Sequence, residues 1–84
     1  MDAKATYEVE VRITPWEEGG YLAEAVGLQG CWAIADTVGQ TIEDIREVVH
    51  LWLDARRTYD MPVPPELARA DDVAIRIVLP VGAT

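Results

Sequence analysis

Few side chains in this sequence are of a type that could do chemistry, and they are spread along it. His50 is the only histidine and Cys31 the only cysteine among the 84 residues. We expect His50 to form an i, i+4 surface pair with Asp54 on a helix, because no nucleophile of suitable spacing accompanies it. Cys31 stands in an apolar run with no cationic neighbour to lower its pKa, so we expect a buried, inert thiol.

Three glutamates form the other candidate group. Glu8 and Glu10 share the polar face of one alternating run, and Glu24 lies in the next run, where it could face them. Such carboxylates could hold a metal ion, but a solvated strand face or a surface for a basic partner is the better interpretation. The turn Gly27-Leu28-Gln29-Gly30 lacks the glycine spacing and the following helix of a phosphate-binding loop. We therefore expect no catalytic residue, no metal site and no cofactor, and we favour a binding module over an enzyme.

One predicted helix must organise the fold that carries these residues. In the stretch 37–58 (TVGQTIEDIREVVHLWLDARRT), a period of about 100° per residue gathers the apolar side chains on one stripe. The members of this stripe include Val38, Ile42, Ile45, Val49 and Trp52. Thr37 with Gln40 fits an N-terminal cap better than Thr41 with Asp44, because Thr37 directly follows a strand-like run. A single amphipathic helix cannot bury its own stripe, so the rest of the chain should form a sheet beneath it.

Alternation and turn residues predict that sheet. The runs typical of strands are 7–13, 21–26, 31–35 and 73–81. Short turns with glycine join the first three runs, which predicts an antiparallel meander. The prolines within 60–65 forbid a helix, and the polar link 66–72 could hold a brief helical turn. We expect a single domain over residues 1–84, an α+β two-layer fold of order β-β-β-α-β with an antiparallel-rich sheet and one main helix.

Some apolar residues should remain outside a monomer's core. We expect that core to contain Tyr7, Val9, Val11, Ile13, Ile45, Val49 and Trp52. The last strand-like run is apolar on both faces, which places it either at the centre of the sheet or at a subunit interface. Leu51 lies opposite the helical stripe. We therefore expect a homodimer or a tetramer, with Leu51, Ile75, Ile77 and Val78 at its interface.

The charge balance limits the partners. Fifteen acidic residues against seven basic ones give a net charge of −8. Such a chain repels phosphate backbones, so we expect no direct nucleic-acid binding, whereas a basic protein partner is compatible with it. The first residues lack the apolar segment of a signal peptide, and no run approaches membrane-spanning length. We expect a cytoplasmic chain without a membrane segment.

The sequence resembles the HicB antitoxin family over roughly residues 7–81. That family typically shows an acidic-Gly-Gly turn, a strand, a Pro-(Asp/Gly)-Leu-Pro-Gly-Cys turn and a Gly-Asp-Thr that opens a helix. The matching positions here are Gly20, Leu28, Gly30, Cys31, Asp36 and Thr37. Val26 and Gln29 replace turn prolines, and Ala35 replaces the glycine before Asp-Thr. The segment 60–64 resembles the stretch that precedes the family's last strand.

The resemblance implies a partial ribonuclease-H-like fold without its catalytic carboxylates. It also implies an antitoxin that binds and occludes a small basic mRNA-cleaving toxin of the HicA type, which carries an active histidine. Longer family members continue into a DNA-binding domain. This sequence stops about where such a domain would begin, so we do not carry DNA binding over. The alternative is a stand-alone, homo-oligomeric HicB-like module that has no toxin partner and serves in ligand binding or as a scaffold.

Overall fold

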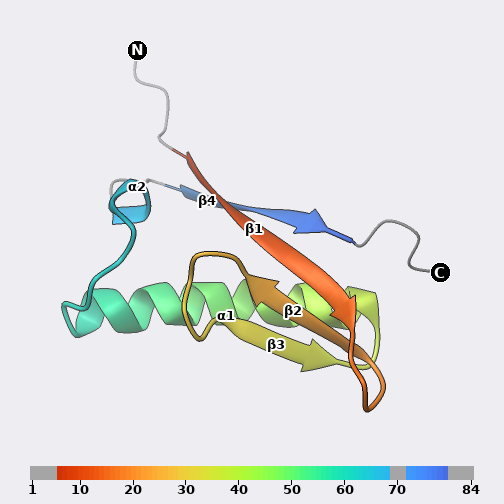
Figure 1. Cartoon of the computed structure of the whole chain (residues 1–84). Coiled ribbons are helices and arrows are strands. Elements are labelled where there is room, and N and C mark those ends of the chain that lie inside the picture. The colour runs from red at the N-terminus through yellow and green to blue at the C-terminus, as the bar shows by residue number, and fades with distance from the viewer. Residues whose placement is uncertain (1–5, 69–71, 80–84) are drawn as a thin grey trace.

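The computed structural model describes residues 6–68 and 72–79, and within them it places one four-stranded sheet against one long helix (Figure 1). The elements, in chain order, are β1 (Thr6–Pro15), β2 (Tyr21–Ala25), β3 (Trp32–Ala35), α1 (Val38–Thr58), α2 (Pro65–Ala68) and β4 (Asp72–Val78). The α+β class and the order β-β-β-α-β predicted from sequence are confirmed. The short α2 is the helical turn that the polar link could hold.

The strand order is β3-β2-β1-β4. β1, β2 and β3 pair antiparallel, as the predicted meander requires. β4 instead pairs parallel with β1, from Thr6 opposite Asp72 to Arg12 opposite Val78. A parallel neighbour needs a long crossover, which α1 and the proline-rich segment after it supply. The last strand is therefore an edge strand, which excludes the central position that the sequence had left open.

The boundaries of α1 follow from its capping residues. The backbone N–H of Gln40 donates a hydrogen bond to Oγ1 of Thr37 at 3.0 Å, so Thr37 is the N-cap, as predicted. Thr41 is buried one turn inside the helix, where its hydroxyl donates to the carbonyl oxygen of Thr37 at 2.6 Å. Arg56 and Arg57 occupy the last turn, where the helix dipole favours cations.

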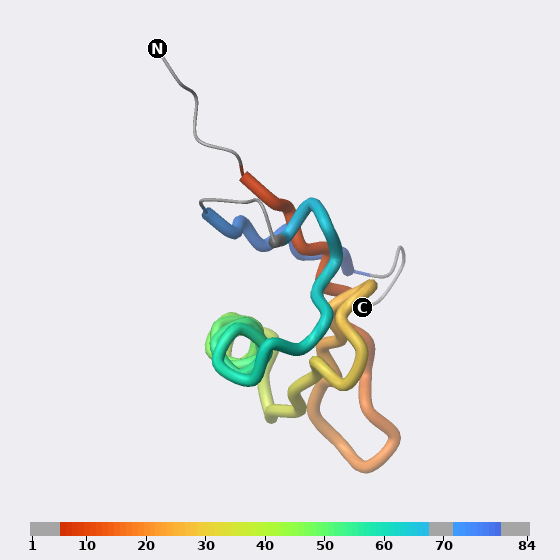
Figure 2. Tube along the Cα trace, turned by 90° about the vertical axis from the view of Figure 1, so that its left-hand side faces the viewer, coloured from red at the N-terminus to blue at the C-terminus, as the bar shows by residue number. Residues whose placement is uncertain are grey.

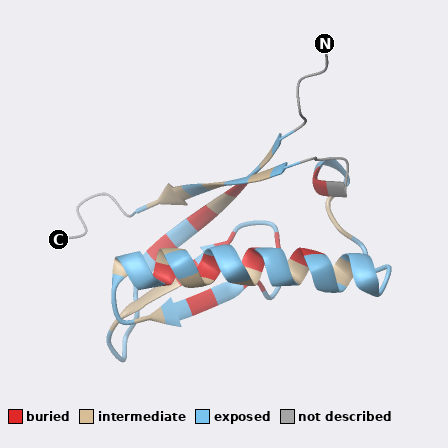
Figure 3. Ribbon diagram, turned by 180° about the vertical axis from the view of Figure 1, so that it is seen from behind, coloured by how far each residue is buried: buried red, intermediate tan, exposed pale blue. Residues whose placement is uncertain are grey.

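The core lies between α1 and the sheet. Ile45, Val49 and Leu53 turn inward from the helix, and the buried stripe is visible from behind in Figure 3. They belong to one cluster with the inward side chains of the strands, among them Val9, Val11, Ile13, Ala23 and Ala33. Tyr7 and Trp52, which we expected in the core, are half-buried and pack against it. Leu67 of α2 is fully buried and was missed, because its neighbours in sequence are polar.

The helix leaves one face of the sheet uncovered within the described part of the chain. α1 packs on β2 and β3, on one side of the sheet, as the view along the helix in Figure 2 shows. Small side chains on the helix-facing side, such as Ala23 and Ala33, let the helix approach closely. The opposite face of the sheet is called the open face below, and it carries the candidate site.

Candidate functional site

Period-2 alternation decides which side chains reach the open face. Val9, Val11 and Ile13 are buried against the helix, so their neighbours along β1 must point the other way. With the strand register, this places on the open face Glu8, Glu10 and Arg12 from β1, Leu22 and Glu24 from β2, Trp32 and Ile34 from β3, and Arg76 and Val78 from β4. The open face is thus charged near β4 and largely apolar near β3.

The charges near β4 neutralise one another. Nε of Arg76 lies 3.1 Å from Oε1 of Glu8, and a second nitrogen of Arg76 bonds Glu10. Nε of Arg12 lies 2.8 Å from the other carboxylate oxygen of Glu10. Two of the three glutamates predicted as partner contacts are therefore held by arginines of the same chain. These pairs are exposed, so each contributes little to stability, but the two pairs of Arg76 join β4 to β1.

The region near β3 is an exposed apolar surface. Trp32 is 54% exposed, Ile34 39% and Trp16 38%. With Leu22 and Glu24, these three side chains line a shallow cavity of about 260 Å³, called the apolar hollow below. Large side chains left open to water in a group, on a small domain with little core to spare, usually mark a surface that another molecule covers.

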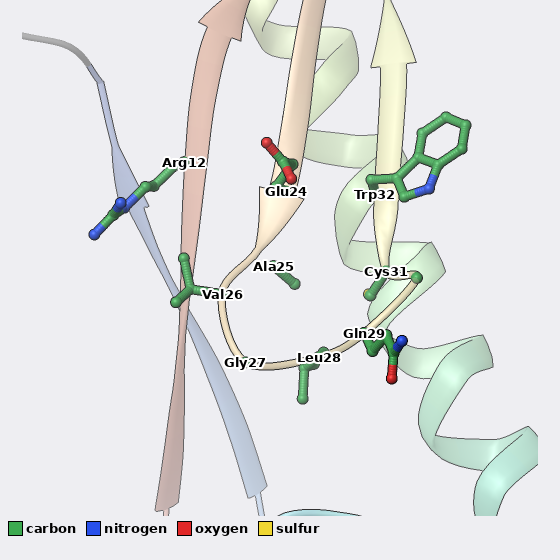
Figure 4. Close-up of a pocket in the computed structure, with 10 residues that line it drawn as sticks. Arg12, Glu24, Ala25, Val26, Gly27, Leu28, Gln29, Cys31 and Trp32 are labelled. Carbon is green, nitrogen blue, oxygen red and sulfur yellow. The ribbon is translucent and has the colours of Figure 1, made fainter.

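A second cavity of about 510 Å³ borders the first one, at the end of β2. It is lined by Arg12 and by residues 24–32, which form the end of β2, the following turn and the start of β3 (Figure 4). Glu24 and Trp32 are direct partners in the register of β2 and β3, and both cavities share these two residues. Figure 4 shows their side chains on neighbouring strands in front of the sheet, with α1 behind.

Hydrogen bonds and buried side chains hold the turn after β2 in place. The N–H of Leu28 donates to the carbonyl oxygen of Ala25, and the N–H of Cys31 donates to the carbonyl oxygen of Leu28. The N–H of Ala25 in turn donates to the carbonyl oxygen of Cys31 at 2.9 Å. Leu28 and Cys31 are buried beneath the turn, and Gly30 takes a positive φ of 78°. The indole N–H of Trp52 donates to the carbonyl oxygen of Gln29, which joins the turn to α1. The motif residues of this turn therefore have structural roles.

Gly20 has a comparable role at the turn between β1 and β2. Its φ is +83°, and a Cβ at this position would overlap the backbone carbonyl oxygen of Ala35. Only glycine allows these two segments to lie so close. Asp36 is exposed beside them, and Thr37 caps the helix.

Comparison with known proteins identifies the family. No family model matches the sequence. A UPF0150 protein (ssl0259) of Synechocystis sp. (strain ATCC 27184 / PCC 6803 / Kazusa) is 38% identical over 52 residues, which cover 62% of this chain and 71% of the relative. A second UPF0150 protein of that organism (ssr1765) is 32% identical over 63 residues, 75% of this chain and 80% of the relative. The chain belongs to the UPF0150 family.

The remaining candidate residues of this UPF0150 protein are dispersed. Glu24 lies opposite Arg12 in the β1–β2 register, and not opposite Glu8 or Glu10 as the sequence suggested. His50 is exposed on α1. Cys31 is only 3% exposed, and burial raises the pKa of its thiol, which is the environment of an unreactive cysteine. Within residues 6–68 and 72–79, no group of three or more His, Cys, Asp or Glu side chains could hold a metal ion.

The residues predicted for a subunit interface also occupy different surfaces. Leu51 is 59% exposed on α1. Ile75 and Ile77 are half-buried on the helix side of β4, and Val78 lies on the open face. None of the described helices is long and apolar enough to cross a membrane.

Sequence reasoning missed the apolar hollow, although its signal was present. The buried alanines of β2 and β3 alternate with Leu22, Trp32 and Ile34. This pattern puts large apolar side chains on the outer face and small ones inside, the reverse of an ordinary two-layer sheet. The tertiary reason is that α1 packs directly on β2 and β3, so the alanines of the inner face lie against the helix.

Proposed function

We propose that this UPF0150 protein is a HicB-like antitoxin domain, which binds and occludes a small basic mRNA-cleaving toxin of the HicA type. The observation that carries the proposal is the open face, where exposed tryptophans lie beside an acidic side chain on a chain of net charge −8. A surface of this kind suits a basic protein, and large aromatic side chains dominate the energetics of protein interfaces.

The resemblance to HicB proteins supports the same function. The positions that carry it, Leu28 to Cys31 and Asp36 with Thr37, form the turn beneath the open face and the cap of α1. They shape this turn and start the helix, and so belong to the frame that carries the open face. Inhibition by a frame of this type needs no chemistry of its own, because covering the toxin's active histidine prevents it from reaching mRNA. The opposite net charges of this acidic chain and a basic toxin would speed their association at low ionic strength.

Co-expression tests the proposal. The tagged chain is captured from its native cell, and the reading frames beside its gene are cloned as candidate partners. We expect one short basic protein that arrests growth and cleaves mRNA when it is expressed alone, and that becomes harmless when this chain is co-expressed. If none of the neighbouring or captured proteins is a growth-arresting nuclease, or if co-expression fails to neutralise one that forms a complex with this chain, the proposal is wrong.

A second candidate function is a stand-alone, homo-oligomeric module without a toxin. The observation that favours it is the position of β4 at the sheet edge, where Ile75 and Ile77 remain half-buried and Leu51 and Val78 add apolar surface elsewhere. An edge strand of this length can pair with a second copy. The reading frames beside the gene separate the two cases, because a short basic frame there favours the antitoxin and its absence favours the stand-alone module. Light scattering at micromolar concentration tests the oligomer itself. A 9.3 kDa species would contradict the oligomer.

A further inference from the structure

Glu24 differs from the other two glutamates that the sequence marked as partner contacts. Glu8 and Glu10 are neutralised by Arg76 and Arg12. Glu24 takes part in no ion pair among the described residues, although Arg12 lies across from it in the register. Its carboxylate therefore carries an uncompensated charge at the rim of the apolar hollow.

We propose that Glu24 and the apolar hollow bind an arginine, together with a neighbouring apolar side chain, from an exposed segment of a basic partner protein. The identity of that partner rests on the proposed function, whereas the chemistry of the contact rests on the hollow alone. A carboxylate and the face of a tryptophan ring both attract a guanidinium group. The aliphatic part of the arginine can meanwhile cover apolar surface.

The chain itself contains one example of this contact. The guanidinium carbon of Arg56 lies 4.2 Å from the ring centroid of Trp52, on the other layer of the molecule. There the arginine comes from the next turn of the same helix. Trp32 and Trp16 on the open face have no such arginine of their own among the described residues.

The charges around the hollow select a basic occupant over a second copy of the chain. Glu17 and Glu18 are exposed on the turn that follows Trp16, whose side chain lines the hollow, so this turn adds negative charge beside Trp16. The arginines on the open face, Arg12 and Arg76, are both held in ion pairs. A symmetric contact through the hollow would bring two acidic surfaces together on chains that each carry a net charge of −8. A segment that carries arginine compensates these charges.

A peptide probe tests the contact without knowledge of the partner. The probe is a short synthetic peptide of interspersed arginine and leucine residues, and a version with lysine in place of arginine is the comparison. Binding to the full chain is measured by tryptophan fluorescence and by amide shifts in NMR. We expect the shifts to concentrate on β2 and β3. We expect weaker binding of the lysine version, because lysine lacks the planar group that stacks on indole.

Matched variants locate the site. Trp32→Ala and Glu24→Lys change exposed side chains of the hollow, and each should weaken binding about tenfold or more. Leu51→Ala and Glu47→Lys make comparable changes at exposed positions one turn apart on α1, and they should leave the affinity within about twofold. Circular dichroism checks that all four variants keep the fold.

Two results would overturn the proposal. Equal loss of affinity in Glu24→Lys and Glu47→Lys would mean that only the overall charge attracts the peptide. Absence of peptide binding, with a dimer that Trp32→Ala converts to a monomer, would mean that a second copy covers the hollow.

The antitoxin assay separates this site from the proposed function. If Glu24→Lys neutralises a cognate toxin as well as the unaltered chain does, the site is wrong while the function stands. If no toxin exists but the peptide shows the expected pattern among the variants, the site stands while the function is wrong.

Discussion

The indole Nε1–H of Trp52 donates a hydrogen bond of 2.9 Å to the backbone carbonyl oxygen of Gln29, which joins the C-terminal half of α1 to the turn between β2 and β3. This bond links two segments that are far apart in sequence. It also fixes the turn that lines the larger cavity of the open face.

Replacing Trp52 tests the strength of this link. Trp52→Phe keeps most of the packing but removes the donor, and should lower the free energy of unfolding by about 1 kcal/mol. Trp52→Ala should lower it by about 3 kcal/mol, near the lower end for tryptophan because the ring is half-buried. Urea unfolding followed by circular dichroism measures both. Trp16→Phe on the open face is the control and should change stability little; equal stability of Trp52→Phe and the unaltered chain would contradict the expectation.

Two glycines with nearly equal backbone angles separate steric overlap from backbone strain. Gly20 and Gly27 have φ of +83° and +85°, but only at Gly20 would a Cβ meet another atom, the carbonyl oxygen of Ala35. We expect Gly27→Ala to cost about 1 kcal/mol for the left-handed conformation alone. Gly20→Ala should cost about 3 kcal/mol or prevent folding, since the β1–β2 turn must move away from β3. Thermal unfolding of the two variants, compared with each other, is the measurement; similar losses would show that the turn relaxes freely.

The N-cap of α1 should be worth a measurable free energy. Thr37→Ala removes the hydroxyl that accepts from the N–H of Gln40 and should destabilise the protein by about 1 kcal/mol. Thr58→Ala, at the exposed last position of the same helix, is the matched control and should be neutral within about 0.5 kcal/mol. Denaturant unfolding of both variants tests this. A Thr37→Ala variant as stable as the control would mean that water replaces the cap.

Cys31 should make stability fall at alkaline pH. Burial raises the pKa of its thiol above the ordinary 9.0, because the interior disfavours the thiolate. Well below pH 9.0 the thiol is neutral in both states, and its contribution is fully present. As the pH rises from there through the folded-state pKa, the unfolded state loses the proton first, so stability decreases. Unfolding between neutral and alkaline pH should show a steeper loss for the unaltered chain than for Cys31→Ala; parallel curves would indicate an accessible thiolate.

His50 should have no chemical role. It is exposed on α1, and we expect His50→Ala to leave both stability and any antitoxin activity unchanged. The measurements are thermal unfolding and the growth assay with the co-expressed partner. Loss of activity with the fold intact would reopen the question of an enzyme.

Local patterns in the sequence determined the elements of this protein. These patterns are the period-2 alternation of β1, the 3.6-residue apolar stripe of α1 and the cap at Thr37. Each involves residues close together in the chain, so it can be recognised from the sequence alone. The class α+β and the sheet-facing side of the helix follow from the same patterns.

Only the tertiary structure decided which elements became neighbours. The parallel pairing of β4 with β1 depends on backbone hydrogen bonds between residues more than sixty positions apart, which no periodicity encodes. That pairing brings Arg76 to Glu8 and Glu10. The β1–β2 register places Glu24 opposite Arg12, and not opposite Glu8 or Glu10. Leu67 became core for the same reason, since its burial depends on where the crossover returns to the sheet.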